Sequence, residues 1–164
     1  AHFGTGLFGA NAQSEETAGN TEEYQKITEL AEECPCEVAF LGKLSQTELA
    51  KVFRQGDVFV LPSFYEGLPL VLIEAMACGM QTVCTDLPGI QEWVERNVPG
   101  NEVIFVTPPE MENEDEPVKA ALPEFEQKLA DAVLRAANCK SVKEEVLRKL
   151  SWEGVCERLI QLWA

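Results

Sequence analysis

The chain alternates short apolar runs with longer segments in which apolar residues recur every three or four positions. In residues 20–34 (NTEEYQKITELAEEC) this recurrence predicts an amphipathic helix. Continuous apolar runs within residues 37–42 (EVAFLG) and 57–63 (DVFVLPS) are typical of strands buried on both faces. The same pattern predicts further helices at 45–56, from near Pro69 to Gly79, and at 90–95, 118–138, 141–150 and 151–163, with further strands at 81–86 and 101–109.

Local signals mark where several of these helices begin and end. Ser45 is followed three residues later by Glu48, a capping-box pattern that predicts a helix start. Pro69 suits the first turn of the next helix, and Gly79 closes it. Ser151 is positioned to cap the final helix.

Strands that alternate with helices predict an α/β fold with three α/β/α layers, Rossmann-like, around a mainly parallel sheet. We expect one domain over residues 1–164, with residues 109–117 as an acidic, solvated loop and 151–164 as a C-terminal helix. Ligands of such sheets bind beyond the carboxyl ends of the strands. The loops to examine for chemistry are therefore 42–44, 62–69 and 85–90.

Charge and hydropathy exclude several partner classes. The 164 residues include 28 acidic and 13 basic side chains, a formal net charge of −15, which would repel nucleic acids and anionic membrane surfaces. No apolar stretch is long enough for a membrane-spanning helix. The N-terminus, AHFGTGLFGA, lacks the build of a signal peptide.

The cysteines and the histidine indicate neither a disulfide framework nor a metal site. Several of the six cysteines lie in apolar runs, so we expect reduced thiols packed in the core, although an even number leaves disulfides as an alternative. Residues 34–36 (CPC) do not form a CxxC pair, and His2 is the single histidine, so a zinc site is not expected.

Two carboxylates bracket the most apolar segment, residues 64–79 (FYEGLPLVLIEAMACG). The helix here is apolar nearly all round, so we expect it to be buried centrally. Its N-terminus would lie at the edge of the sheet formed by loops 42–44, 62–69 and 85–90, which we call the rim. Its free amides, with Gly67 allowing close approach, would suit a diphosphate. Glu66 and Glu74 would accept hydrogen bonds from a sugar and from a ribose diol. Together these features describe a nucleotide-sugar site.

Each acid also has a purely structural interpretation. Glu66 could complement the dipole of the helix, an effect of about 0.3–1 kcal/mol. Glu74 could pair with a lysine, an arginine or backbone amides inside the fold.

The segment PSFYEGLPLVLIEAMACG resembles the E-x7-E signature of the retaining glycosyltransferases of family 4, which have the GT-B fold. The resemblance extends to the strand–helix–strand sequence before it, to TDLPGIQEWV after it and to SWEGVCERLIQLW at the C-terminus. It identifies the chain as similar to the C-terminal, donor-binding domain of these enzymes. By this resemblance, we expect the N-terminal acceptor domain and the first strand of the donor domain to be absent from the chain.

The resemblance implies a role for each matching position. Glu66, the catalytic position, would contact the transferred sugar, and Glu74 would hold the ribose hydroxyls. The loop of Gly42, Lys43 and Leu44 would lie against the base. The backbone of the residues between the acids would meet the sugar and diphosphate, namely Gly67, Leu68, Pro69, Leu70 and Val71.

It also implies a reaction: transfer of a glycosyl group from a nucleoside-diphosphate sugar, a UDP-sugar foremost, to an acceptor hydroxyl, with no metal cofactor. The acceptor, a sugar or glycolipid, would bind through the missing domain, so the isolated chain is expected to be inactive. We expect a cytoplasmic protein of polysaccharide biosynthesis, peripheral at the membrane through its missing half. The arginine and lysine that neutralise the diphosphate in the family would lie upstream of Ala1.

Other functions remain compatible with the residues. One is a non-catalytic nucleotide-sugar or nucleotide binder, and another is an interaction domain without a ligand. A third is an epimerase or phosphorylase on the same fold, although no segment resembles a cofactor-lysine site.

Overall fold

The computed structural model of the chain describes residues 6–7, 20–114 and 116–139. The chain forms two compact units, Ala1–Leu49 and Ala50–Ala164, and each is described by itself. The single-domain assignment therefore stays a prediction. The helices predicted at 141–150 and 151–163, with the cap at Ser151, lie outside the described residues.

The first unit contains a helix and a pair of short parallel strands. Strand β1 (Gly6–Leu7) pairs with β2 (Val38–Ala39) in parallel. Helix α1 (Asn20–Glu33) lies between them in the sequence and confirms the predicted helix almost to the residue. Strand β2 is shorter than the predicted run 37–42, because only its first apolar residues pair with a neighbour.

Helix α2 (Gln46–Phe53) begins where the capping box predicts. The backbone N–H of Ser45 donates to Glu48 Oε2 at 2.9 Å, and the N–H of Glu48 donates back to Ser45 Oγ at 3.4 Å. This reciprocal pair satisfies two amides that the first turn leaves free. The α-helix ends at Phe53, before the predicted end at Gly56, and the chain continues in turns.

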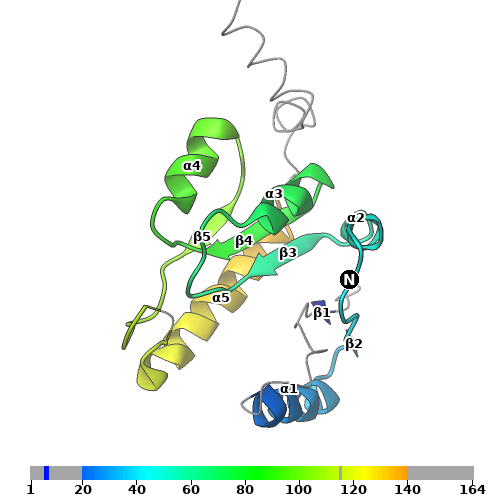
Figure 1. Cartoon of the computed structure of the whole chain (residues 1–164), viewed down its shortest axis with the longest axis vertical. Coiled ribbons are helices and arrows are strands. Elements are labelled where there is room, and N and C mark those ends of the chain that lie inside the picture. The colour runs from blue at the N-terminus through cyan, green and yellow to red at the C-terminus, as the bar shows by residue number, and fades with distance from the viewer. Residues whose placement is uncertain (1–5, 8–19, 115, 140–164) are drawn as a thin grey trace, which may run out of the picture. The chain divides into compact units, whose positions relative to one another are not determined.

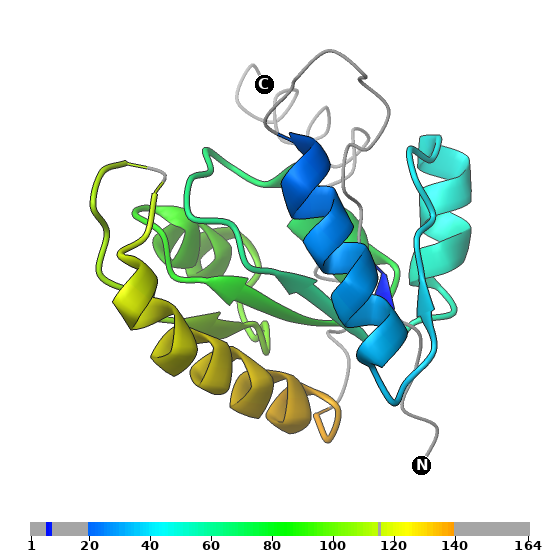
Figure 2. The same ribbon diagram turned by 90° about the horizontal axis from the view of Figure 1, so that it is seen from below.

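The second unit is built on a three-stranded parallel sheet in the order β3 (Val58–Leu61), β4 (Gln81–Thr85), β5 (Ile104–Val106). Helices α3 (Leu70–Ala77) and α4 (Ile90–Asn97) make the crossovers between the strands. Figures 1 and 2 show α3 and α4 on one face of this sheet and α5 (Leu122–Ala136) along the other. The predicted α/β layering around parallel strands is thus present.

Alternate residues of the strands supply two hydrophobic cores. Val58, Val60 and Val83 belong to the cluster that packs against α5. Their neighbours Phe59 and Cys84 belong to the cluster that includes α3 and α4. Because successive side chains of a strand point to opposite faces, an all-apolar strand feeds both cores at once.

Helix α3 ends in a hydrogen-bonded motif that its sequence predicts. Gly79 adopts φ +89°, its N–H donates to Met76 O at 2.9 Å, and the N–H of Met80 donates to Ala75 O at 3.2 Å. These are the two bonds of a Schellman motif, and a left-handed residue at that position favours glycine. At the other end Pro69 is the N-cap, one residue before the first helical position that the sequence suggested for it.

The expectation that α3 is buried all round is wrong. Leu72, Ala75 and Met76 are buried, but Leu70 at the start of the helix is 65% exposed. The spacing of the buried residues places them on a single face, which packs toward the sheet. Uniform hydrophobicity does not reveal which face of a helix packs.

The acidic loop 109–117 contains backbone hydrogen bonds between its two ends. Met111 and Pro117 form an antiparallel bridge, and the N–H of Val118 donates to Glu110 O at 2.8 Å. A short 3₁₀ helix, Lys119–Ala121, then leads into α5. The predicted helix 118–138 is confirmed with this 3₁₀ turn at its start.

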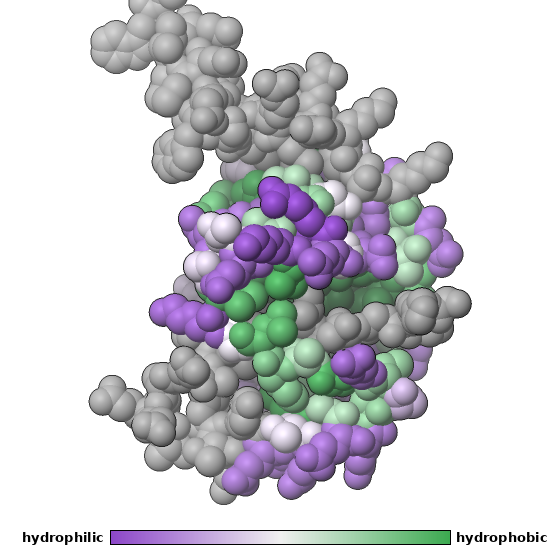
Figure 3. All heavy atoms as spheres, turned by 90° about the vertical axis from the view of Figure 1, so that its right-hand side faces the viewer, coloured by the Kyte–Doolittle hydropathy of each residue, from purple (hydrophilic) through white to green (hydrophobic). Residues whose placement is uncertain are grey.

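Among the described residues, the cysteines are free thiols, but only Cys84 is packed in the core as expected. Cys78 is half-buried, and Cys34, Cys36 and Cys139 are exposed. On the surface, hydrophilic residues cover much of the face in Figure 3, with hydrophobic residues exposed between them.

Candidate functional site

The candidate site follows the carboxyl end of β3, where Pro62 to Pro69 form a loop that leads into α3. Glu66 lies in this loop and is half-buried. The hydroxyl of Ser63 donates a hydrogen bond of 2.8 Å to Glu66 Oε1. No other described residue bonds the carboxylate of Glu66, so Oε2 remains available to a ligand.

The loop is anchored to the body of the second unit by an aromatic pair. The ring of Phe64 packs against that of Phe125 in α5, with centroids 5.3 Å apart and a tilt of 59°. Phe64 therefore serves in packing, and it lies between Ser63 and Tyr65 in the loop. Tyr65 turns outward and is 67% exposed.

The N-terminus of α3 presents free backbone amides. Pro69, the N-cap, makes no side-chain cap, and among the described residues the N–H groups of Leu70 and Val71 have no acceptor. The N–H of Leu72 donates to Pro69 O at 3.0 Å. Unpaired amides at a helix start, with the positive end of the dipole, attract an anion.

Space for a ligand exists beside this helix start. A side-chain carbon built on Gly67 would have no heavy atom within 4 Å. Leu68 and Leu70, on either side of the buried Pro69, are 41% and 65% exposed. Gly67, Leu68 and Leu70 are thus exposed, whereas Pro69 is buried and Val71 is half-buried.

Glu74 lies in the second turn of α3 and is half-buried. Within the part of the chain that the structure describes, its carboxylate has no hydrogen bond and no ion pair. The structural interpretation, a carboxylate paired inside the fold, therefore finds no support among these residues. Both acids of the segment keep oxygen atoms free for an external ligand.

Loops 62–69 and 85–90, the part of the rim in the second unit, carry no positive side chain. The sequence has no lysine or arginine between Arg54 and Arg96. Arg96 pairs with Glu92 at 2.6 Å, and Lys128 pairs with Glu124 at 2.7 Å, both on exposed helix surfaces. Within this segment, the attraction for an anion comes from backbone amides alone.

The three residues predicted to meet the base, Gly42, Lys43 and Leu44, follow β2 in the first unit. Gly42 has φ +62°, a left-handed conformation that favours glycine and turns the chain toward α2. Their role at the base stays a prediction.

Sequence reasoning overlooked Ser63. Its hydrogen bond to Glu66 spans three residues, the same spacing as the bond of 2.6 Å from Ser45 to Glu48. A serine three positions before a glutamate is a usable signal at a helix start, but in an irregular loop the spacing does not fix the geometry.

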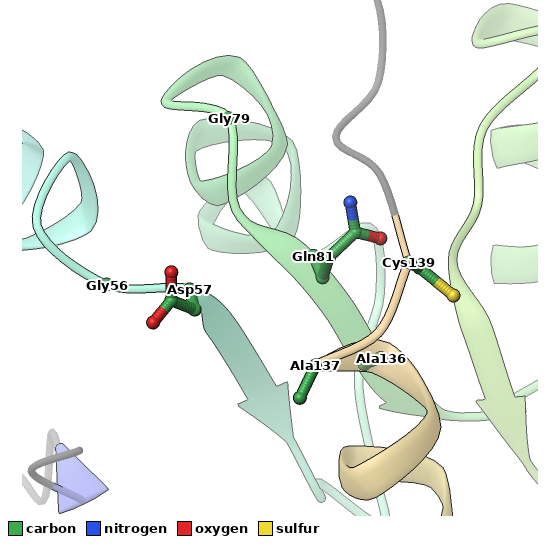
Figure 4. Close-up of a pocket in the computed structure, with 7 residues that line it drawn as sticks. All are labelled: Gly56, Asp57, Gly79, Gln81, Ala136, Ala137 and Cys139. Carbon is green, nitrogen blue, oxygen red and sulfur yellow. The ribbon is translucent and has the colours of Figure 1, made fainter. Parts of the chain in front are cut away.

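A pocket of about 230 Å³ lies at the opposite end of the sheet. Figure 4 shows the residues that line it. Asp57 precedes β3 and Gln81 opens β4, and the end of α5 with Cys139 completes the wall. Gln81 is 7% exposed, and its Nε2 has no partner among the described residues. This pocket is separate from the rim that carries Glu66 and Glu74.

No cluster of His, Cys, Asp or Glu among the described residues has the arrangement of a metal site. In the same residues, no helix combines the length and hydropathy needed to cross a membrane.

Comparison with known proteins gives a consistent result. The family profile described as glycosyl transferases group 1 matches residues 17–132. An uncharacterized glycosyltransferase of Methanocaldococcus jannaschii is 29% identical over 126 residues, 77% of this chain and 30% of that protein. The amylovoran biosynthesis glycosyltransferase AmsK of Erwinia amylovora is 32% identical over 133 residues, 76% of this chain and 31% of that protein.

Among solved structures, a sucrose-phosphate synthase from Thermosynechococcus elongatus matches with a TM-score of 0.56 and 26% identity, over 96% of this chain and 36% of that one. This likeness confirms the predicted fold, the C-terminal part of a GT-B glycosyltransferase. The chain spans about a third of the length of the relatives it matches.

Proposed function

The chain belongs to the glycosyl transferases of group 1, family 4, and from this membership we propose that it is the donor-binding part of a retaining glycosyltransferase. The enzyme would transfer a glycosyl group from a nucleoside-diphosphate sugar to an acceptor hydroxyl. The family uses nucleotide-sugar donors, and we propose a UDP-sugar as the first candidate.

One observation carries this proposal: the uncapped start of α3 lies between two carboxylates with no charged partner. The diphosphate would lie against the free amides of Leu70 and Val71. Glu66 would accept hydrogen bonds from the sugar, and Glu74 from the ribose hydroxyls. The exposed backbone at Gly67 leaves room for the junction between sugar and phosphate.

The chemical contribution of this half is electrostatic and geometric. As the glycosidic bond breaks, negative charge grows on the diphosphate, and amides already oriented toward it stabilise that charge without reorganising. The two glutamates hold the donor in place by its hydroxyls rather than exchanging protons with it. The acceptor, a sugar or glycolipid, would bind to another part of the full-length enzyme.

The decisive experiment is a calorimetric titration of the 164-residue chain with UDP, GDP and ADP and with UDP-glucose, GDP-mannose and ADP-glucose. We expect binding of at least one pair, and Glu74→Gln should weaken both the nucleotide and its sugar conjugate about 10- to 100-fold. Loss of a hydrogen bond to a charged group is worth about 1.5–3 kcal/mol. Glu102→Gln is the matched control, because it removes the same charge from an exposed residue before β5, at the opposite end of the sheet.

An equal effect of the two substitutions would contradict the proposal, because long-range charge rather than a contact would then explain it. Absence of binding by all six probes at millimolar concentration would also overturn it.

A further inference from the structure

We propose that Ser63 is a positioning residue for Glu66, fixing the carboxylate for the hydroxyls of the transferred sugar. The inference rests on the proposed function and deepens it. Its basis is the hydrogen bond of 2.8 Å from Ser63 Oγ to Glu66 Oε1 at the carboxyl end of β3.

The bond connects a flexible side chain to a rigid scaffold. Leu61 ends β3 and pairs in register with Cys84 of the central strand. Ser63 lies two residues after Leu61. The next residue is Phe64, whose ring packs on Phe125 of α5. Ser63 therefore lies in the chain between a strand residue paired in the sheet and a residue packed on α5, whereas the carboxylate of Glu66 has no other hydrogen bond or ion pair among the described residues.

The division of the two carboxylate oxygens suits sugar recognition. Oε1 accepts the proton of the Ser63 hydroxyl, and Oε2 keeps its lone pairs for hydroxyl donors on the ligand. A carboxylate held in one rotamer gives up less conformational freedom when the sugar binds. The benefit should appear in the affinity for the nucleotide-sugar and not in the affinity for the nucleotide alone, which lacks the sugar.

The test compares Ser63→Ala, Ser63→Thr and Glu66→Gln in the 164-residue chain, titrated with UDP, GDP and ADP and with the sugar conjugates UDP-glucose, GDP-mannose and ADP-glucose. We expect Ser63→Ala to weaken nucleotide-sugar binding about 3- to 10-fold, the range of one net hydrogen bond, and to leave nucleotide binding unchanged. Ser63→Thr keeps the hydroxyl and should restore binding. Ser45→Ala removes the same type of serine–glutamate bond from α2 and is the matched control, with an unchanged ratio of the two affinities.

Every other outcome overturns the inference. If Ser63→Ala weakens nucleotide and nucleotide-sugar equally, the bond only braces the loop. If Ser63→Ala has no effect while Glu66→Gln weakens sugar binding, Glu66 needs no positioning, and the proposed function survives alone. If the wild-type chain binds no probe, the proposed function fails and the inference fails with it.

Discussion

At the scale of single residues, Cys84 shows how the sheet controls a thiol. It lies in the central strand and is 1% exposed. Burial, and next the negative charge of Asp86, raise the pKa of this thiol from 9.0 to about 12. The folded protein therefore keeps the neutral thiol in a range of pH in which an exposed cysteine ionises.

This environment predicts selective chemistry. At pH 8, iodoacetamide should modify the exposed Cys139 and spare Cys84, because the thiolate is the reactive form. Peptide mass mapping measures the difference, and modification of Cys84 in urea is the control. Equal rates in the folded protein would contradict the assigned environment.

The same shift has a consequence for stability. Above about pH 9 the unfolded chain loses a proton that the folded chain retains up to about pH 12, so the unfolded state binds fewer protons. The free energy of unfolding should therefore fall as the pH rises through this window.

At the scale of elements, the turn into α3 and the turn out of it use glycine for different reasons. Gly67 has open space around it, whereas Gly79 adopts the left-handed conformation that closes the helix. Substituting each by alanine therefore separates ligand access from folding.

We expect Gly67→Ala to leave the free energy of unfolding unchanged or raised by up to about 1 kcal/mol, because it restricts the unfolded chain. The added methyl group should nevertheless weaken nucleotide-sugar binding about tenfold or more by occupying the space next to the free amides. Gly79→Ala should do the opposite, costing about 1 kcal/mol of stability and leaving the affinity unchanged. Urea unfolding and calorimetry measure both quantities, and the same pattern for both variants would refute this assignment.

How far the sequence predicts these elements depends on how local the signal is. The strands β3 and β4 and the start of α2 were predictable, because apolar runs and the pair Ser45–Glu48 act over a few residues. The partial exposure of α3 was not, since eight mostly apolar residues do not indicate which face meets the sheet.

The positions of Glu66 after a strand and of Glu74 inside the following helix were predictable from the local pattern, and their roles stay predictions. The bond from Ser63 to Glu66 was not, because it depends on the path of an irregular loop. The division of the chain into two compact units after Leu49 was also not predictable. It depends on long-range contacts, which no local sequence pattern encodes.

At the scale of the whole molecule, the chain spans about a third of its relatives and has no basic residue between Arg54 and Arg96. We therefore expect the isolated chain to bind the donor without catalysing turnover. The 164-residue chain should bind the nucleotide-sugar but neither transfer the sugar nor release free nucleotide at a rate above a Glu66→Gln control. A coupled assay for the released nucleoside diphosphate tests this, and turnover by the chain alone would show that the acceptor part is dispensable.

The backbone contacts that join the two ends of the acidic loop 109–117 have a practical consequence. The bridge between Met111 and Pro117, together with the bond from Val118 to Glu110, joins the two ends of this loop outside the segment 113–116. An epitope or affinity tag grafted between Asn113 and Glu116 would thus leave the hydrophobic layers undisturbed. It would also offer a handle for immobilising the protein on a sensor surface without a tag at either end of the 164-residue chain.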